Sequence, residues 1–403
     1  MNITLKKYLD SYKGLPQSVW ILSIMAFTNS VGKMVITFLA LFVTQKLGQS
    51  VTMVGKIMMA YGFGCIIGGI LSGKLCDSID SRKVIIASLF LTGVGFFSLS
   101  MTQTIEWIIL VIFFVGFSES GFRPAYNTTI SRLCPPKNRA RAYSLYRVFI
   151  NVGCSMGAVI GGFLSENNFS VICQLDALTS ILAAVVMLAC YHKLVARLPI
   201  SEEKKTYTFD RPWKDPVFLF FCIIMMGAAF VFFQIKTTYP LYLRDSYEIS
   251  SVQFGLLMSL NGIIILLFEM PLLSWTNKFR TESMAALGAF LLCFGFALLP
   301  VSIWKSLAFV YLLIWTTGEM IIFPTALGIV ANQAPESNRG EVMGIYHTLF
   351  SLSHILAPVL GSLIYAAWSP EILWAISGLI GIVVSLGFYF LPNIARKLQS
   401  AQA

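Results

Sequence analysis

Long apolar runs, separated by short polar segments, recur along the whole chain. A helix needs roughly 20 predominantly apolar residues to cross the hydrocarbon core of a bilayer. Helices are the expected form, because lipid offers backbone groups no hydrogen-bond partner and the runs are too long and uniform for barrel strands. The pattern therefore predicts an all-α membrane protein with 12 transmembrane helices, at about 18–43, 51–73, 84–101, 107–131, 143–164, 170–191, 216–238, 252–275, 283–302, 305–331, 344–367 and 371–391.

Composition and charge support this prediction. Only 12% of the 403 residues are charged and 57% are hydrophobic, whereas about 25% of a soluble domain is charged. The net charge of +10 could indicate a nucleic-acid partner, but the basic residues lie mostly at both ends of the chain and in alternate loops. The opposite loops contain only Lys46, Arg244 and Lys305. The positive-inside rule then places both termini in the cytoplasm, so the basic charge reflects topology and no nucleic-acid partner is expected.

Motifs for cofactor or enzyme chemistry are not found in the sequence. The eight cysteines show no CxxC or Cys–His spacing, and we interpret them as small core hydrophobes. No metal or haem motif, GxxxxGK[ST] nucleotide-binding pattern, HExxH motif or Ser-His-Asp arrangement is apparent. The apolar run after the polar start is long enough to remain as a helix, so no cleavable signal peptide is expected. We therefore expect no cofactor, no metal and no enzymatic activity.

The two halves of the chain repeat one another at an offset of 200 residues. The ungapped alignment pairs Glu119 with Glu319, Pro124 with Pro324, Arg139 with Arg339 and Tyr146 with Tyr346. Six helices per half give both copies the same orientation, so a pseudo-twofold axis along the membrane normal would relate them. We predict six-helix bundles at 1–191 and 216–403, joined by a polar cytoplasmic linker at 192–215.

The two parallel halves, the basic central loop and the segment GKLCDSIDSRK after the second span resemble the major facilitator superfamily over essentially the whole chain. In this segment Gly73, Leu75, Asp77 and Arg82 match the family's G-x-L-a-D-r-x-G-r-K/R signature, whereas Asp80 replaces the signature glycine. The resemblance implies the major facilitator fold. It also implies a gating role for this loop, which in the family holds the halves together in the outward-facing state.

The fifth predicted span contains GCSMGAVIGG, which resembles the antiporter signature G-x-x-x-G-P-x-x-G-G of drug–proton antiporters with 12 helices. Ala158 stands where the proline usually lies, and the copy in the eleventh span keeps that proline as Pro358. The alternative is that small residues at every fourth position simply let helices pack closely. The family's usual arginine in helix 4 is missing, with Phe113 near that position.

A local similarity points to different substrate chemistry. GFRP at 121–124 and GEMIIFP at 318–324 are similar to helices 4 and 10 of proton-coupled oligopeptide transporters. In that family a basic residue and a glutamate there hold the substrate's carboxylate and amine. The E-x-x-E-R motif of that family's helix 1 is absent, because the region reads TNSVGK. The match therefore predicts binding-site chemistry rather than family membership.

Ionisable side chains inside the predicted spans are candidate site residues. A charge at mid-membrane costs at least ~2.5 kcal/mol and persists mainly beside a partner or a water-filled cavity. The candidates are Lys33, Lys56, Glu119, Arg123, Arg147, Lys236, Glu269 and Glu319. For Lys56, snorkelling to the nearby outer surface is the simpler interpretation.

Three glutamates are candidates for proton coupling: Glu119, Glu319 and Glu269. Glu119 and Arg123 are spaced i, i+4 and can meet on one helix face. Two interpretations stay open for them: a pair that neutralises itself for insertion, or a substrate-binding arginine coupled to a proton on Glu119. Glu269 is included because its repeat mate is Gly69, and a residue present in one half only suggests substrate or proton chemistry.

Substrate binding is assigned to charged and aromatic side chains together. The charged ones are Arg123, Lys33, Glu319 and Lys236, although Lys236 near the outer end of its span also fits snorkelling. The aromatic ones are Phe122, Tyr126, Phe233 and Phe323, each of which alone is more often core or lipid-facing. Gating is assigned to Asp77, Arg82, Arg147 and Pro358.

These observations predict a proton-coupled secondary active transporter that exports amphipathic small molecules by alternating access. The alternative is a transporter, possibly an importer, of zwitterionic solutes such as peptides, amino-acid derivatives or siderophores. A membrane-embedded enzyme or a sensor is disfavoured, because neither a catalytic constellation nor an added soluble domain is found in the sequence. We expect a monomer in a bacterial inner membrane, with protons and a small-molecule substrate as partners.

Overall fold

The computed structural model describes residues 13–102, 104–165, 168–194, 215–276, 278–333 and 339–402. Within these residues, twelve helices are long and apolar enough to cross a membrane, from Gln17–Gln45 to Pro370–Leu391. This confirms the predicted all-α fold with 12 spans. The predicted linker lies almost wholly outside the described residues, so its character stays a prediction.

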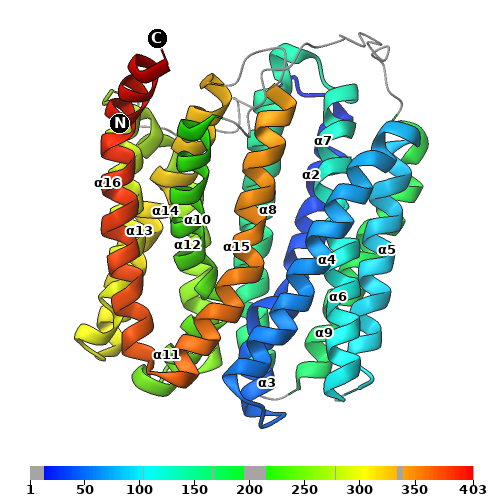
Figure 1. The fold of residues 1–403 in the computed structure, drawn as a ribbon. Helices are drawn as coiled ribbons and strands as arrows, with labels where there is room; N and C mark the ends of the chain where they lie inside the picture. The colour runs from blue at the N-terminus through cyan, green and yellow to red at the C-terminus, as the bar shows by residue number, and fades with distance from the viewer. Residues whose placement is uncertain are drawn as a thin grey trace. The chain divides into compact units, whose positions relative to one another are not determined.

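Figure 1 shows the helices in chain order. In the first part of the chain they are α2 (Gln17–Val31), α3 (Met34–Gln45), α4 (Val51–Ser78), α5 (Ser81–Leu99), α6 (Ile105–Glu119), α7 (Phe122–Leu133), α8 (Pro136–Ser165) and α9 (Phe169–Ala189). In the second part they are α10 (Pro216–Phe233), α11 (Thr238–Tyr247), α12 (Ser251–Thr276), α13 (Thr281–Ala297), α14 (Lys305–Gln333), α15 (Arg339–Ala367) and α16 (Pro370–Gln402). Short 3-10 turns follow α9, α10 and α13.

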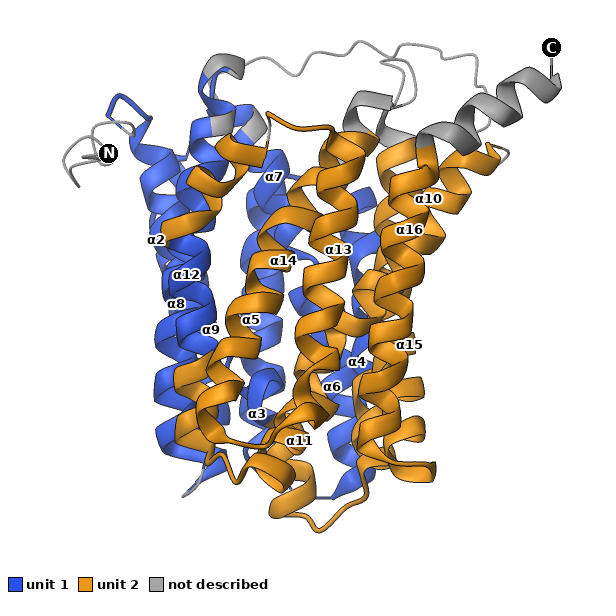
Figure 2. Ribbon diagram, turned by 90° about the vertical axis from the view of Figure 1, so that its left-hand side faces the viewer, with its two compact units in different colours: residues 1–38, 60–203, 258–266 blue, residues 39–59, 204–257, 267–403 orange. Residues whose placement is uncertain are grey.

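The chain divides into two compact units, coloured separately in Figure 2. Unit 1 contains residues 1–38, 60–203 and 258–266, and unit 2 contains residues 39–59, 204–257 and 267–403. The boundaries cut through α3, α4 and α12, so these units differ from the two halves of the sequence repeat. The division into six-helix bundles therefore stays a prediction.

Unit 1 is built on packing of α2 against α8 and α9, and of α5 against α6 and α9. Its buried apolar cluster includes Leu22 of α2, Leu89 of α5, Tyr126 of α7, Leu145 of α8 and Met187 of α9. Large apolar side chains of the same helices are exposed, as expected for surfaces that face lipid rather than water.

Unit 2 is built on packing of α13 against α14 and α16, and of α10 against α15 and α16. Its interior is aromatic: the fully buried Phe296 stacks against Trp315 and Trp374, with ring centroids 5.4 and 6.0 Å apart. A side chain at Gly295 would collide with Trp315. The glycine therefore lets α13 approach α14 closely enough for the rings to stack.

The first and seventh spans, which the hydrophobic pattern predicts as single helices, are interrupted. In the first span, α2 ends at Val31 and α3 begins at Met34, with Gly32 and Lys33 between them. Near the end of the predicted seventh span, α10 ends at Phe233 and a 3-10 turn leads into α11. Polar residues lie at both points, but so few of them beside long apolar runs do not predict a break.

The matched prolines have different effects. The fourth span is interrupted between α6 and α7, just before Pro124, whose missing N–H and bulky ring disfavour a bond to the carbonyl of Ser120. In contrast, α14 continues as one helix through Pro324. The fourth span is thus interrupted at Pro124, and the tenth is continuous at Pro324.

Candidate functional site

An ion pair within the spans of unit 1 forms the centre of the candidate site. The ammonium Nζ of Lys33, in the break of the first span, lies 3.0 Å from Oε1 of Glu119 at the end of α6. The Lys33 side chain is 41% exposed and that of Glu119 only 16%. The hydroxyl of Tyr61 on α4 donates to Oε2 of the same carboxylate at 3.0 Å. Both oxygens of Glu119 are therefore engaged, one by a cation and one by a phenol.

Close helix packing holds these side chains together. Cβ atoms added at Gly116 of α6 or at Gly64 of α4 would overlap the backbone carbonyls of Tyr61 and Phe113, respectively. The glycines therefore permit backbone contact between α4 and α6. Because Gly116 is one turn before Glu119, this contact fixes the height at which the carboxylate meets Tyr61.

Asp176 on α9 is a site residue that sequence reasoning missed. Its side chain is fully buried, and its carboxylate accepts hydrogen bonds from the backbone N–H groups of Met34 (3.3 Å) and Val35 (2.8 Å). These are the first amides of α3, where the helix dipole favours a negative charge. The available signal was an acidic residue in the middle of the predicted sixth span.

The glycines of the antiporter-like signature contact the broken first span. Side chains added at Gly153 and Gly157 of α8 would press on the backbone carbonyls of Phe27 and Val31, and one at Gly161 would press on the ring of Phe38. The stripe of small residues therefore brings α8 against both sides of the break. This geometry favours the packing interpretation of the signature.

Arg123 and Arg147 carry exposed side chains on α7 and α8. Arg123 and Lys33 both interact electrostatically with the phenol of Tyr146, so the three polar groups share one neighbourhood. Tyr146 stacks on Tyr126, with ring centroids 3.9 Å apart.

Phe122 and Tyr126 belong to the buried cluster of unit 1. Tyr126 has no exposed surface. Its buried ring supports Tyr146 by stacking, and the role of both residues in substrate binding stays a prediction.

The loop after α4 holds a compact polar cluster. Asp80 caps α5 and accepts from Nε of Arg82 at 2.9 and 3.0 Å, and from the hydroxyl of Tyr191 at 2.9 Å. Burial disfavours the carboxylate, but the hydrogen bonds from Arg82 and Tyr191 outweigh it and lower the pKa of Asp80 to about 2. Arg82 also donates to the backbone carbonyl of Leu194 at 2.8 Å. Asp80, which replaces the signature glycine, therefore ties this loop to the turn that follows α9. The side chain of Asp77 lies outside the described part.

The break in the seventh span is held by a neutral side chain. Gln234 is fully buried, and its Nε2 donates to the carbonyl of Ala357 on α15 at 3.0 Å, while its Oε1 accepts from the hydroxyl of Thr238 at 2.8 Å. A side chain at Gly361 would overlap the amide of Gln234. Sequence reasoning missed Gln234 because an amide carries no charge to mark it.

Two predicted binding residues of unit 2 meet at a histidine that was not predicted. The ring of Phe233 lies against that of His354, with centroids 3.5 Å apart, and Lys236 interacts electrostatically with the same histidine. Phe323 makes an edge contact with Phe232 at 5.0 Å. Unit 2 thus presents an aromatic group beside a basic one.

The remaining predicted residues of unit 2 lie on α12, α14 and α15. Glu269, on α12, is only 8% exposed although its neighbours Phe268 and Met270 are exposed. Glu319 on α14 is half-buried. Pro358 lies inside α15, and its carbonyl would be 2.8 Å from a Cβ at Gly55, so α4 packs closely at this proline.

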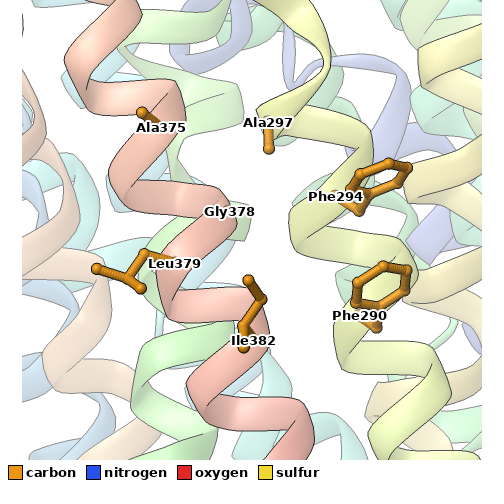
Figure 3. Close-up of a pocket in the computed structure, with 7 residues that line it drawn as sticks. All are labelled: Phe290, Phe294, Ala297, Ala375, Gly378, Leu379 and Ile382. Atoms are coloured by element: carbon orange, nitrogen blue, oxygen red, sulfur yellow. The ribbon is translucent and has the colours of Figure 1, made fainter.

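A groove on α13 and α16 contains apolar residues only (Figure 3). Figure 3 labels its lining residues as Phe290, Phe294, Ala297, Ala375, Gly378, Leu379 and Ile382. Both helices are candidate spans, and the larger side chains of the groove are exposed. Lipid tails therefore suit this groove, and it offers no group to recognise a polar or charged substrate.

Twelve candidate spans and an ion pair within them are features of a multi-pass membrane protein. The chain belongs to the Major Facilitator Superfamily, because the model of that family matches residues 22–358 and 321–403. It is therefore a multi-pass secondary transporter and not an enzyme.

Comparison with known proteins adds relatives and structural neighbours. The chain is 25% identical over 344 residues to "Multidrug resistance protein MdtH" of Yersinia enterocolitica, covering 83% of each chain. It is 21% identical over 376 residues to a "Na(+), Li(+), K(+)/H(+) antiporter" of Planococcus maritimus, covering 85% of this chain and 87% of that one. A structure of the peptide transporter POT with alafosfalin matches with a TM-score of 0.80 at 17% identity, covering 98% and 99% of the two chains. A structure of the nucleoside transporter NupG matches with a TM-score of 0.78 at 15% sequence identity, covering 93% of this chain and 99% of that one. The structural matches show the fold alone.

Proposed function

We propose that this transporter is a proton-coupled antiporter that exports amphipathic small molecules by alternating access. The observation that carries the proposal is the ion pair between Lys33 and Glu119, at a break in a spanning helix. The distant relatives that are described as multidrug resistance proteins and a cation/proton antiporter add support.

The ion pair provides a way to couple a proton to a movement. While Lys33 lies 3.0 Å from Glu119, the charged carboxylate is stabilised. A movement at the break that withdraws the ammonium removes this stabilisation and favours uptake of a proton by Glu119. Proton binding and the conformation of the first span are then linked, as alternating access requires.

An amphipathic substrate needs both charged and apolar surfaces, and the chain offers both. In unit 1, Lys33 and Arg123 present exposed basic groups near Tyr146. In unit 2, Phe233 and Phe323 belong to an aromatic group.

The test is transport by the full chain in proteoliposomes with and without an imposed pH gradient, with an anionic aromatic sulfonate dye as the amphipathic probe. The wild-type protein should move the probe faster with the gradient. Glu119→Gln should lose this dependence. Glu106→Gln is the matched control, because Glu106 is exposed in the first turn of the same helix, and it should behave as wild type. Wild-type flux that ignores the gradient for this dye and for other amphipathic probes would overturn proton coupling. Full gradient dependence in Glu119→Gln would overturn the role of this glutamate.

Transport of zwitterionic solutes is the second candidate function. The exposed guanidinium of Arg123 within a spanning segment favours it, because arginine binds carboxylates through paired hydrogen bonds. Arg123→Ala separates the two functions. If the variant still exports amphipathic probes without a carboxylate but loses transport of a dipeptide, the zwitterionic function stands. If the variant transports both kinds of probe as well as wild type, the zwitterionic function is rejected.

A further inference from the structure

The break in the first span is enclosed by α9 and α8 of unit 1. From α9, the carboxylate of Asp176 binds the N–H groups of Met34 and Val35. A side chain at Gly32 would overlap Thr179, one turn further along α9, and would lie 3.1 Å from the Cα of Asp176. The backbone of the break therefore rests directly on α9, and the start of α3 is fixed by one buried side chain.

A carboxyl group suits this position better than an amide. Each of its two oxygens accepts from one backbone N–H group of α3, whereas an asparagine would turn an NH2 donor toward one of these N–H groups. The positive end of the α3 dipole also favours negative charge density there. In unit 2 the side chain buried at the break is the neutral amide of Gln234.

Lys33 is the residue immediately before the two amides that Asp176 binds. Its backbone cannot shift or join a continuous helix unless Met34 and Val35 leave the carboxylate. From the other side, α8 contacts the carbonyl of Val31 through Gly157. The ammonium of Lys33 therefore reaches Glu119 from an anchored backbone.

We propose that Asp176 is a positioning residue for the coupling pair: it holds the break in the first span and thereby sets Lys33 against Glu119. The proposal rests on the proposed role of that pair in proton coupling. Release of the α3 amides from Asp176 is then the step that withdraws Lys33 during the transport cycle.

Hydrogen–deuterium exchange of the full chain in detergent tests the anchoring without any substrate. In wild type, the amides of Met34 and Val35 should be protected. Asp176→Asn should raise their exchange by about tenfold or more, because opening of the break becomes easier. Ser180→Ala is the matched control: it removes a hydrogen bond from α9 to Asn29 of α2 in the same interface but leaves the carboxylate, and it should leave these amides protected.

A second route perturbs the same contact in case Asp176→Asn does not fold. Gly32→Ala should raise exchange at the α3 amides because its methyl group would overlap Thr179. Thr179→Ala, combined with it, should restore part of the protection. Unchanged exchange in both Asp176→Asn and Gly32→Ala would overturn the proposal.

Transport then separates a positioning role from general loosening. Lys33→Met should slow gradient-driven export of the anionic dye in the wild-type and Ser180→Ala backgrounds. In the Asp176→Asn background it should have no further effect, because the pair is already apart. An equal slowing by Lys33→Met in all three backgrounds would overturn the proposal. Increased exchange in Asp176→Asn together with no gradient-driven flux in wild type would instead reject proton coupling and leave the anchoring intact.

Discussion

Replacing either member of the Lys33–Glu119 pair should destabilise the protein, and replacing both should recover most of the loss. At 3.0 Å, two unit charges attract by about 5.5 kcal/mol at an effective dielectric constant of ~20. Desolvation of the charges offsets much of this attraction. Solvent reaches Lys33, which is 41% exposed, and screens it further. We therefore expect Lys33→Met and Glu119→Gln each to lower the free energy of unfolding by about 1–3 kcal/mol.

The measurement is unfolding of the purified protein in mixed micelles with increasing amounts of sodium dodecyl sulfate. The wild type, both single variants and the double variant form a double-mutant cycle. We expect a coupling energy of about 1–2 kcal/mol, since the double variant no longer buries one charge without the other. Lys56→Met is the control, because Lys56 is an exposed lysine of another span, and it should change stability by less than about 0.5 kcal/mol. Losses that simply add in the double variant would refute the reasoning.

Three further predictions concern single contacts. Tyr61→Phe should lower stability in the same titration by about 1.5–3 kcal/mol, because it removes a hydrogen bond to the charged Glu119; unchanged stability would contradict the contact. Gly157→Val should reduce the yield of monodisperse protein in size-exclusion chromatography, since its side chain would overlap the carbonyl of Val31, and a normal yield would show that α8 can move away. Stability should fall as the pH drops from about 4 toward 2, because the pKa of Asp80 is about 2 in the folded protein and 3.8 in the unfolded chain. The ionised carboxylate contributes about 1 kcal/mol after solvent screening above this pH window, and the contribution is lost within it. Asp80→Asn should flatten this pH dependence.

The spans could be predicted from the sequence because a bilayer imposes one simple rule, a long run of apolar residues with internal hydrogen bonds. The same rule does not locate the breaks. The polar stretch that ends at Lys33 is too short to divide the apolar run, and the carboxyl group of Asp176, distant in sequence, accepts from the free amides of α3. The repeat did not help either, because the break near Lys33 aligns with the apolar Phe233 rather than with another charge.

The sequence identified residues of the candidate site but not the contacts between them. Lys33 and Glu119 were both identified because charges within spans are costly. The sequence suggested Arg123 as a partner for Glu119, because local spacing is the only geometry that a helix pattern provides. The structure records the pair with Lys33, which depends on packing between helices that are distant in sequence. Tyr61 was missed because a phenol within an apolar run resembles an ordinary core residue.

The interruptions of the first and seventh spans show how a repeated architecture acquires an asymmetric function. Backbone groups that leave the helix ladder at such a point need partners. In unit 1 the carboxyl group of Asp176 accepts from two backbone N–H groups of α3. In unit 2 the neutral amide of Gln234 donates to the carbonyl of Ala357 and accepts from the hydroxyl of Thr238. Each interruption contains a lysine, Lys33 or Lys236, but the first also has a carboxyl group, which can take up a proton, bonded to its backbone. The first span is therefore where proton coupling should be sought.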